Sequence, residues 1–161
     1  MRPQIAVYPG SFDPIHNGHL DIIERCEKIF DGVLIAVLKN EEKRPLFSVE
    51  ERVEIIREMM EGRPAVRVES FSGLLVDFMD KVEAKAVVRG LRAVSDFEYE
   101  FQMALMNRQL HPSLETVFLV PAVDLTYLSS SLVREVARFG GDVSGLVHPM
   151  VAEALAGRYR A

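Results

Sequence analysis

The chain has 161 residues, of which 48% are hydrophobic and 27% charged, so it is long enough for one globular domain and too apolar for a disordered chain. Its formal net charge of −5 argues against broad contact with a nucleic-acid backbone, and no apolar run approaches the roughly 18 residues of a membrane span. The single cysteine, Cys26, excludes an intrachain disulfide, and the N-terminus lacks a signal-peptide core, so we expect a cytoplasmic protein.

Five short β-type runs alternate with helical patterns along the chain. The predicted strands are Ile5–Tyr8, Val33–Leu38, Ala65–Glu69, Ala86–Arg89 and Thr116–Val120. The second run is apolar throughout, which is typical of a strand covered on both faces. This alternation predicts one α/β domain over residues 1–161. It has a Rossmann-like arrangement, with a five-stranded parallel sheet and helices on both faces.

Helix starts and stops are also legible in the sequence. We expect helices over 17–29 and 48–62, a short helix after Ser72, and others that begin near Ser95, near Ser131 and at Pro149. Pairs of Ser and Glu three residues apart, at 48 and 51 and at 95 and 98, predict capping boxes. Spacing within the helical stretches indicates core packing for Cys26 and for methionines such as Met103.

The segment Gly10-Ser-Phe-Asp-Pro-Ile-His-Asn-Gly-His19 joins the first predicted strand to the first predicted helix. A turn, free main-chain N–H groups and two imidazoles therefore meet at the positive end of a helix, a place that attracts phosphate. His16 and His19 are three residues apart and share one face of the first helical turn. The His-x-Gly-His pattern is short, but its place between a strand and a helix makes it a more specific indication of a phosphate site.

Candidate ligand-binding residues, most of them suited to phosphate, follow each of the five predicted strands. In chain order these are Ser11, His16 and His19; Lys43; Ser72, Gly73 and Leu75; Arg89 to Arg92; and Thr126 with Ser129 to Ser131. Ligands of an open parallel sheet bind outside the carboxyl ends of its strands. The five groups are therefore expected to gather on one rim.

Each candidate also has a structural interpretation. The two histidines can cap a helix, Lys43 lies in a charged loop, and Ser129–Ser131 taken alone is best read as a helix start. Arg89 is harder to explain as structural, because it closes an apolar strand. The acidic residues at 96, 98 and 100 lack the spacing of a metal cage and suit the start of a helix, so no metal ligands are predicted.

Several longer motifs resemble one family from end to end. They are Tyr-Pro-Gly-Ser-Phe-Asp-Pro at 8–14, Asn-Gly-His at 17–19, Arg-Gly-Leu-Arg-Ala-Val at 89–94, Asp-Phe-Glu-Tyr-Glu at 96–100 and Ser-Ser-Ser-Leu-Val-Arg-Glu-Val at 129–136. The chain resembles the nucleotidylyltransferase superfamily and, within it, the bacterial phosphopantetheine adenylyltransferases. Ser11 and His16 stand where many of these relatives have Thr. Serine keeps the hydroxyl at position 11, and the change at position 16 bears only on substrate tuning.

The resemblance implies that ATP and 4′-phosphopantetheine give dephospho-coenzyme A and pyrophosphate, with Mg²⁺ as cofactor, in a homohexamer. Together with rim position, it implies catalytic roles for His19, Lys43 and Arg92. Acceptor binding is expected of Ser11, Lys43, Leu75 and Arg89. ATP binding is expected of Ser11, Phe12, His19, Gly90, Leu91, Arg92, Glu100, Leu125, Thr126, Tyr127, Leu128, Ser129, Ser130 and Ser131.

Other functions remain open at this stage. A cytidylyltransferase or a nicotinamide-mononucleotide adenylyltransferase belongs to the same class, although the Arg-Thr-x-Gly-x-Ser-Thr type of signature is replaced here by residues 125–131. A non-catalytic nucleotide or coenzyme A sensor would keep the pocket but would need no transition-state donor. A Rossmann dehydrogenase ranks low, because no Gly-x-Gly-x-x-Gly follows the first strand.

Overall fold

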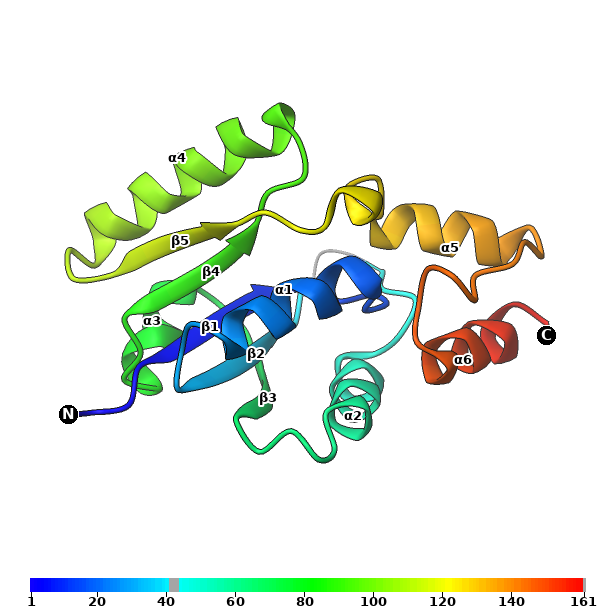
Figure 1. Ribbon diagram of the computed structural model, residues 1–161, viewed down its shortest axis with the longest axis horizontal. Coiled ribbons are helices and arrows are strands. Elements are labelled where there is room, and N and C mark those ends of the chain that lie inside the picture. Colours follow the sequence, from blue (N-terminus) through cyan, green and yellow to red (C-terminus); the bar gives the residue numbers. More distant parts are fainter. Residues whose placement is uncertain (41–43, 161) are drawn as a thin grey trace.

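The computed structural model describes residues 1–40 and 44–160, with only the backbone at position 95. Its centre is a parallel sheet in the order β3-β2-β1-β4-β5 (Figure 1). The strands are β1 (Ile5–Gly10), β2 (Gly32–Leu38), β3 (Val66–Phe71), β4 (Ala86–Gly90) and β5 (Glu115–Leu119). The predicted five-stranded parallel sheet is confirmed, and each strand end lies within two residues of its predicted place.

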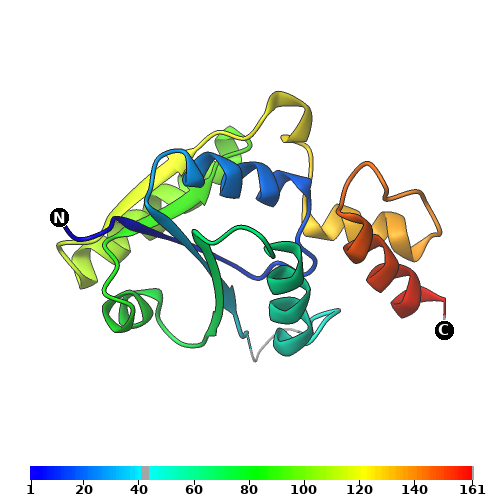
Figure 2. The same ribbon diagram turned by 60° about the horizontal axis from the view of Figure 1, so that its bottom comes forward.

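The helices lie on both faces of this sheet, as predicted. They are α1 (Asn17–Glu27), α2 (Val49–Met59), α3 (Leu75–Lys81), α4 (Val94–Leu110), α5 (Ser130–Arg138) and α6 (Pro149–Tyr159), with a short 3₁₀ turn η1 (Val123–Leu125) that the sequence did not predict. Figures 1 and 2 show α1 and α3 on opposite faces, with the two termini at opposite ends of the molecule. Among the described residues, no helix is long and apolar enough to cross a bilayer.

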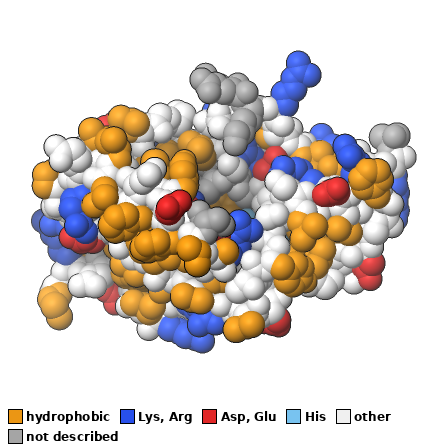
Figure 3. All heavy atoms as spheres, turned by 90° about the horizontal axis from the view of Figure 1, so that it is seen from above, with side chains coloured by type: hydrophobic (Ala, Val, Ile, Leu, Met, Phe, Trp, Pro, Cys, Tyr) orange, Lys and Arg blue, Asp and Glu red, His pale blue; other side chains and the backbone are white. Residues whose placement is uncertain are grey.

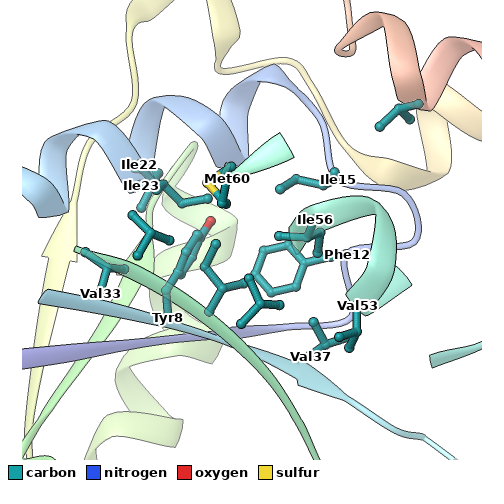
Figure 4. Close-up of a cluster of buried hydrophobic side chains, with 14 of the residues drawn as sticks. Tyr8, Phe12, Ile15, Ile22, Ile23, Val33, Val37, Val53, Ile56 and Met60 are labelled. Carbon is teal, nitrogen blue, oxygen red and sulfur yellow. The ribbon is translucent and has the colours of Figure 1, made fainter. Parts of the chain in front are cut away.

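Alternation along β2 divides the core into two layers. Val33, Ile35 and Val37 belong to a cluster that also contains side chains of α1, α2, α5 and α6. Leu34 and Ala36, which lie between them in sequence, belong to a second cluster with α3. Successive side chains of a strand point to opposite faces, so an unbroken apolar run is what a doubly covered strand requires. Figure 4 shows the first cluster gathered above the strands.

One helix differs from its predicted form. The capping box expected at 95 and 98 is wrong, because α4 already begins at Val94 with Ala93 as its N-cap. Asp96 instead reaches back, and its Oδ2 accepts the main-chain N–H of Arg92 at 3.3 Å. The box expected at Ser48 and Glu51 is confirmed. Asp96 thus binds the residue before the N-cap, and no described side chain caps α4 itself.

The apolar stripe of α4 also differs from expectation, because it is largely exposed. Phe97, Phe101, Met103 and Leu105 are each at least 40% exposed, so Met103 is not core filler as predicted. Helix α4 packs against α3 and β5 through few neighbours and leaves much of its apolar surface uncovered. Figure 3 shows hydrophobic side chains gathered on the same side of the molecule as α4 in Figure 1.

Two buried charged residues tie together the loops at the carboxyl edge of the sheet. Both carboxylate oxygens of Asp13 accept main-chain N–H groups, from Leu46 at 2.8 Å and Phe47 at 2.9 Å. The guanidinium of Arg52 donates to the carbonyls of Ser11, Leu38, Phe47 and Ser48. The chain builds the sheet outward from β1 in one direction, through β2 and β3, and then in the other, through β4 and β5. The switch point therefore lies between β1 and β4, and ligands of doubly wound sheets bind at such a point.

Candidate active site

Among the cavities at this carboxyl edge, two share a border. The first, of about 270 Å³, is lined by polar groups of the β1 loop, α1, β4 and the start of α5. The second, of about 520 Å³, is lined largely by apolar side chains of α3 and α4. Both are lined by Pro9, Gly10, Ser11, Arg89 and Glu100. A ligand in one cavity therefore meets a ligand in the other at this border.

His16 and His19 form a capping box at the N-terminus of α1. Nδ1 of His16 accepts the main-chain N–H of Gly18 at 3.0 Å, and Nδ1 of His19 accepts that of His16 at 3.1 Å. The two rings stack with their centroids 3.7 Å apart. Because both Nδ1 atoms accept hydrogen bonds, each neutral ring carries its proton on Nε2. Both histidines line the first cavity, so the structural and the functional interpretation hold together.

The local sequence leaves little freedom around these rings. A Cβ at Gly18 would lie 2.8 Å from Cε1 of His16, so only glycine leaves room for the cap. Phe12 adopts φ 49°, a left-handed conformation that is uncommon outside glycine. Its ring is 3% exposed and meets both Tyr8 and His19 edge to face, which holds the turn in place.

Burial keeps both imidazoles neutral near pH 7. Desolvation, assisted by the charge of Arg92, lowers the pKa of His16 to about 4. The pKa of His19 also falls well below its ordinary value, through desolvation and then the nearby charges of His16, Arg89 and Arg92. A neutral Nε2–H in this place is a hydrogen-bond donor to an anion, not a strong base.

Arg89 lies at the border of the two cavities and is paired with α4. Its Nε and Nη2 donate to the two carboxylate oxygens of Glu100 at 2.8 and 2.7 Å, and its Nη1 donates to the carbonyl of Pro9 at 2.6 Å. Desolvation opposes its charge, but the bonds with Glu100 prevail and the pKa of Arg89 lies above its ordinary value. The described contacts take three of the five guanidinium N–H groups, which leaves two for a ligand.

Arg92 is held in a similar way farther into the first cavity. Its Nε donates to Oδ2 of Asp96 at 3.1 Å, and its Nη1 donates to the carbonyl of Leu128. Asp96 and Glu100 are four residues apart, so they share one face of α4. Both rim arginines therefore take their orientation from one helix.

The serine cluster begins α5, as its structural interpretation predicted. Oγ of Ser129 is the N-cap acceptor for the N–H of Leu132 at 3.1 Å, and Ser130 donates to the carbonyl of Pro14 at 2.8 Å. Ser131 lies one residue on, where its Oγ accepts from Arg134. Ser129 and Ser130 still line the first cavity, at the N-terminus of a helix.

The structure brings most of the predicted site residues together. The first cavity is lined by Ser11, Phe12, His19, Arg89, Gly90, Arg92, Glu100, Leu125, Ser129 and Ser130, and Leu75 lines the second. Five predicted ATP contacts do not line the first cavity: Leu91, Thr126, Tyr127, Leu128 and Ser131. Lys43 lies outside the described residues, so its expected role stays a prediction.

Sequence reasoning missed several lining residues. Tyr8 and Pro121 line the first cavity, and Asp96 lines it while holding Arg92. The second cavity takes Met103, Met106 and other residues from α4, whose spacing gave a core interpretation. Gly90 lines the first cavity as expected, and a Cβ there would lie 3.2 Å from Ile22, so packing against α1 also constrains this position.

No metal cage is present among the residues that the structure describes, since no three His, Cys, Asp or Glu side chains gather as potential ligands. The two carboxylates that line the first cavity, Asp96 and Glu100, are both paired with arginines. The donor set of this cavity thus suits anions.

A parallel doubly wound sheet with an anion site at its switch point is typical of nucleotide-binding proteins, among them the nucleotidyltransferases. The family model described as Cytidylyltransferase-like matches residues 7–136. Among solved structures, the fold is similar to a putative nicotinate-nucleotide adenylyltransferase from Vibrio parahaemolyticus. The TM-score is 0.73 at 18% identity, and 96% of this chain and 99% of that one are covered. That likeness supports the fold alone.

Curated relatives narrow the family. The chain is 59% identical over 155 residues to the phosphopantetheine adenylyltransferase of Heliobacterium modesticaldum, with 96% of this chain and 92% of the relative covered. It is 55% identical to that of Dictyoglomus turgidum, with 96% and 97% covered. The chain belongs to the phosphopantetheine adenylyltransferase family.

Proposed function

We propose that the protein transfers the adenylyl group of ATP to 4′-phosphopantetheine and forms dephospho-coenzyme A and pyrophosphate. Membership of the family supports this assignment, because the relatives carry that activity in their names. The single structural observation that carries it is the shared border of the two cavities. A polar cavity with imidazole and guanidinium donors adjoins an apolar cavity at Ser11 and Arg89.

This border fits the chemistry of two such substrates. The first cavity offers hydrogen-bond donors and positive charge to a triphosphate, through His19, Arg92 and the N-terminus of α5. The second offers Leu75, Met103 and Met106 to a long arm of low charge. Arg89 stands where the phosphate of the acceptor meets the α-phosphate of ATP.

The reaction is a direct displacement at the α-phosphorus. An oxygen of the acceptor phosphate forms the new P–O bond while the bond to the leaving pyrophosphate breaks. That oxygen is already ionised near pH 7, so no general base is needed. The barrier lies in bringing two anions into line and in the charge that develops on the phosphoryl oxygens.

Several polar side chains of the first cavity have a part in lowering this barrier. His19 donates its Nε2–H to the α-phosphate, and Arg92 with Ser129 and Ser130 holds the β- and γ-phosphates. Ser11 and Arg89 orient the acceptor phosphate. The resemblance to the family implies the same role for Lys43. Pre-oriented donors of this kind act most strongly where charge grows in the transition state.

We propose that Mg²⁺ accompanies ATP. Magnesium commonly keeps several waters and binds substrate phosphates with few protein ligands. This mode of binding suits a cavity in which both carboxylates, Asp96 and Glu100, are already paired with arginines. The expected result is loss of turnover on chelation, with recovery when Mg²⁺ is added back.

We also propose that the chain assembles with copies of itself, as the homohexamer that the resemblance implies. The exposed apolar side chains of α4 support self-association, because monomeric proteins seldom leave a large apolar patch uncovered.

We propose a cytoplasmic location as well. A reducing cytoplasm suits Cys26, which is buried and free and whose pKa is raised by burial to about 11.

The test is pyrophosphate release with a panel of nucleoside triphosphates and acceptors. We expect release with ATP and 4′-phosphopantetheine, and little with CTP, nicotinate mononucleotide or nicotinamide mononucleotide. Preferential release with another pair would reassign the substrate. Nucleotide binding without release for any acceptor would favour a sensor.

A further inference from the structure

The two carboxylates of α4 hold the rim arginines by one scheme but with different tightness. In each pair the acid binds the Nε and Nη2 edge of the guanidinium, and a main-chain carbonyl binds Nη1. The Arg89–Glu100 bonds measure 2.7 and 2.8 Å. The Arg92–Asp96 bonds measure 3.1 and 3.5 Å. The first is a close bidentate pair and the second is loose.

Exposure separates the two pairs further. The side chain of Glu100 is 12% exposed and that of Asp96 is 27% exposed, while their partners Arg89 and Arg92 are similar at 32% and 38%. Release of Glu100 would leave a desolvated carboxylate without its partner, which is strongly unfavourable. Separation of the Arg92 guanidinium from Asp96 costs less, because this carboxylate is more exposed to water and still has the main-chain N–H of Arg92 as a partner.

An anion that reaches these arginines therefore meets two different situations. At Arg89 it finds two N–H groups outside the pair, so it can bind while Glu100 stays in place. At Arg92 the edge bound by Asp96 is weakly held and open to exchange for a phosphate oxygen. Bidentate guanidinium–phosphate contacts are stronger than long, partly exposed carboxylate contacts.

We propose that Glu100 is a positioning residue that stays on Arg89 throughout the reaction, while Asp96 is a counterion that Arg92 exchanges for the phosphates of ATP and pyrophosphate. This inference rests on the proposed function, since it takes Arg92 as the pyrophosphate contact and Arg89 as the acceptor contact. It assigns opposite effects to two acids one helical turn apart.

The experiment uses three charge-neutralising variants of the full chain. Glu98 lies between the two acids in sequence, is exposed and contacts neither arginine among the described bonds, so Glu98→Gln is the matched control. Binding of inorganic pyrophosphate and of 4′-phosphopantetheine is measured by titration calorimetry. Steady-state KM and kcat are measured beside it.

Asp96→Asn is expected to bind pyrophosphate about two- to fivefold more tightly, the range for losing a partly exposed competing ion pair. Glu100→Gln is expected to bind 4′-phosphopantetheine at least about tenfold more weakly, because Arg89 loses its anchor. Glu98→Gln should change neither affinity. A purely structural role would not give opposite signs for neighbouring acids.

Unchanged or weaker pyrophosphate binding by Asp96→Asn would overturn the exchange. Unchanged or tighter acceptor binding by folded Glu100→Gln would overturn the anchor. If Glu100→Gln does not fold, Glu100→Asp keeps the charge but shortens the reach, and the same weakening is expected of it. Failure of the wild-type protein to release pyrophosphate would instead overturn the proposed function, so the two failures are distinguishable.

Discussion

The imidazole of His19 accepts the main-chain N–H of His16 through Nδ1, while the two rings stack with centroids 3.7 Å apart. A proton on His19 Nδ1 would break this cap, and charge on both rings would place like charges in contact. The pair is therefore stable as two neutral rings. Each keeps one Nε2–H donor beside the phosphate site.

Replacement of His19 tests the donor role. We expect His19→Ala to lower kcat by roughly 10²–10³-fold, the usual scale for one lost oxyanion donor, with little change in ATP affinity. Single-turnover rates and ATP titrations measure the two effects separately. His111→Ala is a suitable control, because the His111 side chain pairs with Asp80 and lines neither cavity. Turnover near wild type in His19→Ala would remove His19 from catalysis.

Stability should fall as pH drops, through the same histidines. The folded-state pKa of His16, about 4, lies below the ordinary 6.5, so between these values the unfolded chain binds a proton that the folded chain does not. Folding free energy is then lost as pH falls, by up to about 1.4 kcal/mol per pH unit for each such group. Urea unfolding at pH 7 and pH 5 measures this.

His16→Thr provides the matched comparison. Threonine is also a good N-cap residue but does not titrate in this range, so the variant should show a flatter dependence between pH 7 and pH 5. An equal slope in both proteins would place the titration elsewhere in the chain.

Arg52 should contribute to stability. Its buried guanidinium joins the carbonyls of Ser11 and Leu38, which follow or end neighbouring strands. We expect Arg52→Met to lower the free energy of unfolding by about 2–4 kcal/mol, because several charge-assisted bonds are lost. Arg57→Met, which removes one bond to the carbonyl of Val68, should cost less. Equal losses would contradict this cross-link.

The apolar cavity predicts a selective effect on one substrate. Leu75→Asp should raise the KM for 4′-phosphopantetheine by about tenfold, since an apolar contact with the substrate worth about 1.5 kcal/mol is replaced by a charge. The KM for ATP should stay within about twofold of wild type. Steady-state kinetics with each substrate varied in turn provide both values. An equal rise in both would place Leu75 outside the acceptor site.

Self-association can be tested on α4. Phe101 and Met106 are 46% and 54% exposed. Replacing both with Lys should shift the protein toward monomers in sedimentation velocity without unfolding it. Lys at Ile29, which is 58% exposed on another surface, should leave the assembly unchanged. A monomeric wild-type protein would contradict the proposed hexamer.

The sequence predicted what depends on local pattern. The unbroken apolar run of β2 and the capping box at Ser48 follow from periodicity and cap chemistry, and both are confirmed. The gathering of His19, Arg89 and Arg92 was predicted because each follows or ends a strand of a parallel sheet, whose carboxyl ends share one edge. These features require no knowledge of which distant side chains meet.

What depends on tertiary contact could not be predicted. The apolar residues of α4 read as core because periodicity does not reveal whether a second layer covers them. Asp96 and Glu100 read as helix-start charges because their arginine partners come from the preceding strand and loop. The space beside Gly90 is set by Ile22, a residue of another element.

The stereochemical course at the α-phosphorus tests the central claim most directly. Two substrates that meet at Arg89 and Ser11 react in a single in-line displacement. ATP made chiral at the α-phosphorus should therefore give dephospho-coenzyme A with inverted configuration. Retention would require two displacements through an adenylylated side chain and would contradict direct transfer between the two cavities.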